Sequence, residues 1–219
     1  MGITRRLSTR IIEMTQAVKE IAAAAQPAAE HCGARELSRI SDLGRTRGPA
    51  LSESNALNEH GVAVIKSIAQ ELEARVASET RVNGVDAFAG DCAPSVPLVA
   101  YMSRLARYVN VWHGHAGGAE SAGVRAAVMA LIYLERLEKG GFAVTAVNVH
   151  RLAMVAFLLA VKFSEDSFIG GEWWAKVGGV PCSELKLLEA RFCTLLNWKL
   201  SVSDSAYAAM LDLHQPPEF

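Results

Sequence analysis

The sequence lacks the short motifs that mark most nucleotide-binding and hydrolytic enzymes. Its Gly-Gly pairs fit neither G-x-G-x-x-G nor the P-loop pattern, and neither G-x-S-x-G nor H-E-x-x-H occurs. His113 and His115 form a close histidine pair, but no cysteine or further histidine stands near them in the sequence to complete a metal site. We therefore expect a protein that is not an enzyme and that holds no metal and no cofactor.

The chain also lacks an excess of charge of either sign and any long apolar run. The formal net charge is -1, whereas proteins that neutralise many phosphates usually carry a basic excess, so the balance disfavours a nucleic-acid partner. The central apolar run, between Arg151 and Lys162, has about ten residues, roughly half of a bilayer span, and predicts no membrane segment. No C-x-x-C pair and no signal-peptide core occur, which favours a reduced protein of the cytoplasm or the nucleus.

What the sequence does have is apolar residues at helical spacing. Hydrophobic residues make up 51% of the chain, enough for a sizeable core. The stretch Ala146–Phe163 is apolar on nearly every side, which predicts a buried helix at the centre of an all-α domain, with Thr145 as its N-cap. Lys162 would then emerge at the edge of the core. We find no convincing alternation typical of β-strands in residues 94–213.

Helical spacing and Gly- or Pro-rich breaks divide the chain into five parts. Residues 1–26 predict an amphipathic helix, 27–56 a linker, and 57–93 an additional helix and loop that pack on the next unit. Residues 94–213 form the main unit of about five or six helices, and 214–219 are a tail. The narrow apolar stripe of residues 1–26 has three open interpretations: it lies on the chain's own core, it pairs with a second copy, or it docks on a third protein.

A series of short motifs follows the main unit in order. They are Tyr133-Leu134-Glu135-Arg136, Asn148-Val149-His150-Arg151-Leu152, Ala160-Val161-Lys162-Phe163, Trp174-Ala175-Lys176-Val177-Gly178-Gly179-Val180 and Leu195-Leu196-Asn197-Trp198-Lys199-Leu200. In this order they resemble the cyclin box, and specifically the Pho80-like cyclins (P-type or U-type) with a single box, whose patterns are YLDR, N-x-H-R-L, A-x-K-F, YAKVGGI and LLDFRL. The resemblance covers about residues 94–202. It implies a box of about five helices around the central one, with extra N-terminal helices outside it, and we expect no second box.

The resemblance also implies a function. Cyclins are regulatory, activating subunits that bind a cyclin-dependent protein kinase as a heterodimer and position its C-helix, which implies a role in phosphate sensing, the cell cycle or growth control. In the family, a lysine ending the third helix and a glutamate of the fifth contact the kinase, and these fall on Lys162 and Glu189. Apolar interface positions fall on Phe163, Cys193, Trp198 and Leu200. An alternative is a cyclin-fold scaffold in transcription or nucleic-acid complexes.

Two departures from the family pattern carry further expectations. Cyclins usually have aspartate in the YLDR element, paired with an arginine of the first helix, whereas this chain has Glu135. We therefore predict a structural pair between Arg104 and Glu135. The first helix also lacks the M-R-A-I-L motif of mitotic cyclins, so we do not expect substrate recruitment through the groove that this motif forms.

Overall fold

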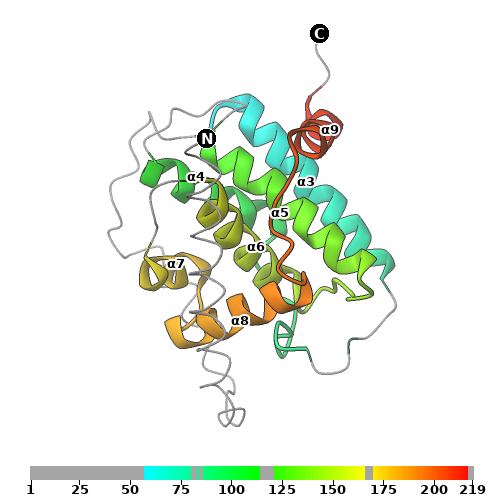
Figure 1. Ribbon diagram of the computed structural model, residues 1–219, viewed down its shortest axis with the longest axis vertical. Coiled ribbons are helices and arrows are strands. Elements are labelled where there is room, and N and C mark those ends of the chain that lie inside the picture. The colour runs from blue at the N-terminus through cyan, green and yellow to red at the C-terminus, as the bar shows by residue number, and fades with distance from the viewer. Residues whose placement is uncertain (1–56, 80–82, 84–85, 114–120, 166–169, 217–219) are drawn as a thin grey trace.

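The computed structural model describes residues 57–79, 83, 86–113, 121–165 and 170–216, and within these residues it contains helices and no strand. The helices are α3 (Glu59–Ser78), α4 (Leu98–His113), α5 (Ala122–Lys139), α6 (Val149–Ser164), α7 (Gly171–Gly178), α8 (Cys182–Leu195) and α9 (Asp204–His214). The predicted N-terminal helix and the linker lie outside the described residues. Figure 1 shows α5 and α6 in the middle of the molecule, with α3 and α9 on one side and α7 and α8 on the other.

Local sequence signals set several of the helix ends. Side-chain oxygens of Asn58, Ser121 and Ser203 accept backbone N–H bonds at the starts of α3, α5 and α9, which satisfies donors that have no partner inside the helix. α7 ends at Gly179, whose φ of 78° is the left-handed backbone that glycine adopts without steric cost. The Gly-Gly punctuation seen in the sequence therefore does mark helix ends.

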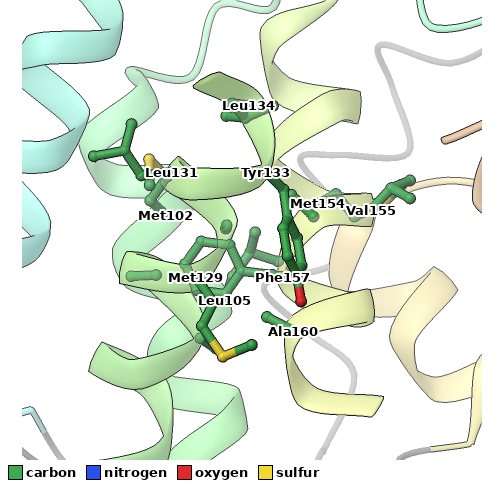
Figure 2. Packing of buried hydrophobic residues seen from close by; sticks show 14 of the residues in the cluster. Met102, Leu105, Met129, Leu131, Tyr133, Leu134, Met154, Val155, Phe157 and Ala160 are labelled. Atoms are coloured by element: carbon green, nitrogen blue, oxygen red, sulfur yellow. The ribbon is translucent and has the colours of Figure 1, made fainter. Parts of the chain in front are cut away.

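The predicted central helix is confirmed as α6. Every residue from Leu152 to Val161 is at most 1% exposed, because α6 packs against α4, α5, α7 and α8 at once. Figure 2 shows Phe157 of α6, Tyr133 of α5 and Leu105 of α4 among the buried side chains of this core. A helix surrounded in this way has no polar face, and this explains why the sequence shows no polar stripe there.

The start of α6 differs from the prediction. The helix begins at Val149, and the residue at the N-cap position is Asn148, not Thr145. The Asn148 side chain accepts a bond from Thr145 N (2.8 Å) and donates to Asp86 Oδ2 (2.7 Å). The buried amide thereby ties the turn before α6 to the loop of residues 86–90, and Thr145 lies in that turn.

α3 adds an outer layer to the helices that follow it. Its apolar side chains, from Val64 to Leu72, are fully buried against α4, α5 and α9. Arg75, in its last turn, bonds to Glu135 (3.1 Å) and Glu138 (2.9 Å) of α5 and also to Glu71. Hydrophobic burial and a charged network on the rim thus both hold α3 to the body of the fold.

Candidate functional site

The last turn of α6 and the middle of α8 bring two charged side chains together. Lys162 Nζ donates a hydrogen bond to Glu189 Oε1. The lysine side chain is 16% exposed and the glutamate side chain 11%. Both charges therefore lie at the edge of the core, where they are largely removed from water.

The fold explains why this pair forms. The ten residues directly before Lys162 on α6, 152–161, are buried, so the helix carries the ammonium to the place where the core ends. Glu189 lies on the inner face of α8, between the buried Leu188 and Ala190. A charge that is mostly removed from water costs free energy unless it is paired, so each side chain stabilises the other in this position.

Cys193 lies one turn after Glu189 and is fully buried. Burial raises the pKa of its thiol to about 12, with the negative charge of Glu189 adding to the effect and Lys162 opposing it. The thiol is therefore protonated and unreactive at neutral pH. This corrects the assignment of Cys193 to a binding surface, because its side chain belongs to the buried core and has no exposed area.

The other predicted apolar positions divide into two groups. Phe163 and Trp198 are partly buried and pack on the core, and each keeps part of its surface exposed. Leu200 is only 6% exposed and belongs to the core. Of the apolar positions assigned from the resemblance, Phe163 and Trp198 are therefore the ones with surface to offer a partner.

The backbone that carries Trp198 is unusual. Asn197 and Trp198 follow α8 with φ values of 49° and 60°, so two consecutive residues other than glycine are left-handed. That conformation costs roughly 1–2 kcal/mol for each such residue. The amide of Trp198 donates to Cys193 O (2.9 Å), which fixes the turn to the end of α8. Sequence reasoning missed this turn, because no glycine marks it.

The predicted Arg104–Glu135 pair is wrong. Glu135 bonds to Arg75 and Lys139, and the Arg104 guanidinium lies over the Tyr101 ring, 5.0 Å from its centroid. The helix register gives the reason. Gly123 of α5 packs against Ala106 of α4, and Glu135 lies 12 residues beyond that contact whereas Arg104 lies two residues from it. At about 1.5 Å per residue the two side chains start on the order of 15 Å apart, beyond their combined reach.

Neither a metal site nor a membrane-spanning helix is found in the described part of the chain. It contains no group of three or more histidine, cysteine, aspartate or glutamate side chains placed to hold a metal ion. Nor does any helix in it combine the length and apolar character needed to cross a membrane. His113 lies 3.8 Å from Glu165, and its sequence neighbour His115 is outside the described residues.

The structure defines an all-α domain in which the other helices surround one buried helix. Comparison with known families gives a match to a family with this kind of fold. The family model described as Cyclin matches residues 5–200, most of the chain. The protein therefore belongs to the cyclin family, whose members are generally non-catalytic regulators. The match begins well before residue 94, so the family's model extends further toward the N-terminus than the motifs do.

Curated relatives place the chain in the P/U subfamily of cyclins. Cyclin-P4-1 of Oryza sativa subsp. japonica is 32% identical over 143 residues, which cover 61% of this chain and 62% of the relative. Cyclin-U1-1 of Arabidopsis thaliana is 28% identical over 159 residues, 69% of this chain and 70% of the relative. Cyclin-P2-1 of the same rice is 34% identical over 122 residues, 55% and 51%. The matched part thus spans between about half and 70% of these relatives.

Proposed function

We propose that the chain is a regulatory subunit that binds a cyclin-dependent protein kinase and activates it by positioning the kinase C-helix. One observation carries the proposal: Lys162 and Glu189, the positions that the cyclin resemblance assigns to the kinase interface, meet at the junction of α6 and α8. Phe163 follows the lysine directly and keeps exposed aromatic surface. An ammonium and a carboxylate have several donors and acceptors between them, so the pair has the capacity to bond main-chain groups of a partner.

The mechanism that follows is positional. A protein kinase needs the lysine of its β3 strand paired with the glutamate of its C-helix before phosphoryl transfer. A subunit that binds the kinase better with that helix turned inward raises the population of the active state. The regulatory chain contributes binding energy, and all bond-making remains in the kinase. We place this activity in the cytoplasm or the nucleus, and in phosphate sensing, the cell cycle or growth control.

The test is binding to a panel of purified cyclin-dependent kinases by the tagged full chain. The variant Lys162→Ala plus Glu189→Ala should weaken capture of the partner kinase and lower its stimulated activity, while circular dichroism shows unchanged helix content. Removing interface anchors typically costs about 1–2 kcal/mol or more each, so we expect a loss of at least roughly tenfold in affinity.

The chain offers a matched control on the same two helices. Arg151 of α6 and Glu184 of α8 form a second ion pair, with a distance of 3.0 Å between Arg151 Nε and Glu184 Oε1 and side chains 22% and 28% exposed. Arg151 lies at the opposite end of α6 from Lys162, and Glu184 lies in the first turn of α8. The variant Arg151→Ala plus Glu184→Ala should therefore leave capture unchanged. Equal capture by both double variants would refute the proposed site, and capture of no kinase by the unmodified chain would refute the function.

A further inference from the structure

The segment that leaves the left-handed turn is held by two side chains of α5. Arg136 donates from Nη1 to Lys199 O (2.6 Å) and from Nη2 to Ser201 O (2.9 Å). Tyr133 donates its hydroxyl to Leu200 O (2.7 Å). Three successive carbonyls are thus each held by a side chain from a single helix, α5.

The geometry of the two side chains suits this role. Tyr133 and Arg136 stand three residues apart, so they share one face of α5. The two terminal nitrogens of the planar guanidinium donate to the carbonyls of Lys199 and Ser201, and the buried phenol donates to the carbonyl between them. The arrangement therefore fixes the direction of the chain as well as its distance from α5.

The turn needs such an external constraint. Its own backbone bonds are local, from Trp198 N to Cys193 O (2.9 Å) and from Lys199 N to Leu196 O (3.1 Å). Left-handed backbone at two residues other than glycine persists only when the surroundings hold it. The hydrogen bonds from α5 to the carbonyls of residues 199–201 supply that constraint to the segment directly after Trp198.

We propose that Arg136, together with Tyr133, is a positioning residue that sets the orientation of Trp198 for partner binding. This inference rests on the proposed function. It assigns a role to Tyr133 and Arg136, which are not among the residues assigned to the kinase contact. Arg136 itself need not touch the partner. It acts through the backbone of residues 199–201, and its effect on affinity passes through the indole of Trp198.

The first experiment measures Trp198 without any partner. The chain has four tryptophans, so 5-fluorotryptophan labelling gives few ¹⁹F signals, and Trp198→Phe identifies the signal of Trp198. In Arg136→Ala, the Trp198 signal should shift and broaden while the other three stay in place. Arg107→Ala is the matched control, because Arg107 is an exposed arginine on α4, and it should leave all four signals unchanged. An unchanged Trp198 signal in a folded Arg136→Ala chain would overturn the proposal.

The second experiment is a double-mutant cycle with the purified kinase captured as described above. Arg136→Ala should weaken affinity about tenfold in the unmodified chain but less than about twofold when Trp198→Ala is already present, because coupled residues are not additive. A purely structural arginine would give the same loss in both backgrounds, and that result would refute the inference. If Lys162→Ala and Trp198→Ala both bind the kinase normally, the proposed site is wrong and the inference fails with it, whereas capture of no kinase by the unmodified chain would refute the proposed function.

Two further variants keep the test decisive if Arg136→Ala does not fold. Arg136→Lys keeps the charge but loses the two-pronged grip, and should give a smaller shift of the Trp198 signal in the same direction. Asn197→Val places a β-branched side chain at φ 49°, which disturbs the same turn without touching α5. Both should weaken kinase binding in proportion to the change at Trp198, and normal binding by both would contradict the proposal.

Discussion

Breaking the Lys162–Glu189 pair from one side should destabilise the fold more than removing both charges together. Lys162→Met leaves the Glu189 carboxylate only 11% exposed and without its ammonium, and Glu189→Met does the converse to a lysine that is 16% exposed. Unpaired buried charges carry a desolvation cost, whereas two methionines of similar length fill the space without any charge.

The magnitude follows from the burial. Removing one partner of a fully buried pair costs about 3–5 kcal/mol, and because water still reaches part of both side chains we expect about 2 kcal/mol for each single variant. The double methionine variant should lose only about 1 kcal/mol, which gives a coupling of about 3 kcal/mol. For a chain of this size, each single change should lower the melting temperature by about 4–8 °C and the double by about 2–4 °C.

The assay is urea unfolding followed by circular dichroism on the four chains of the cycle. The slope of the free energy of unfolding against urea concentration should be the same for all four chains, so that differences in the unfolding midpoint report stability alone. A double variant that loses as much as the two singles combined would refute the coupled, buried pair. The double methionine chain is also a useful reagent, because it should be well folded yet bind a kinase weakly.

Three further changes test the packing, the charged rim and the pH response. Gly178→Ala places a Cβ against Met154 Sδ, far inside contact distance, and should cost about 2 kcal/mol in urea unfolding; the same change should cost less in a chain that already carries Met154→Ala. Arg75→Met leaves Glu135 facing Glu138 and should cost about 1–2 kcal/mol; an unchanged melting temperature would show that the network adds nothing. Burial lowers the pKa of His214 below its usual 6.5, although Glu71 opposes this, so the neutral ring stabilises the fold above about pH 6.5. That contribution is lost as pH falls through the lower folded pKa, and His214→Gln should flatten melting temperature against pH between 8 and 5.

The sequence alone predicted the helices well, for identifiable reasons. α6 was visible because a helix packed on every side needs apolar residues on every side, and its length excluded an ordinary strand. Glycine after α5 and α7 marked breaks, because Gly141 (φ 89°) and Gly179 (φ 78°) adopt the left-handed backbone that favours glycine. The start of α6 was misplaced because Thr145 and Asn148 are both residue types that often precede a helix, and the sequence does not show that the Asn148 side chain bonds to Thr145 N and, far away in the chain, to Asp86.

The charged partners were predicted less well. Lys162 and Glu189 were assigned to one kinase contact only because the motif order resembles a family, since spacing alone cannot say that the end of one helix meets the middle of another. The Arg104–Glu135 prediction failed because pairing between helices depends on their register, which is set by the close approach of Gly123 to Ala106. Arg75 takes Glu135 because α3 lies across α5, and nothing local to either residue indicates this.

Composition and periodicity by themselves determined that this cyclin is all-α, that one helix lies at its centre, and that a lysine stands where that helix leaves the core. These properties are local, because they follow from the residues within one helix and from water. Tertiary structure alone decided which charges meet, that Cys193 faces inward, and that Arg136 reaches across to hold the turn of Trp198. Such features depend on distances between segments remote in the chain, and those distances are set only when the helices pack.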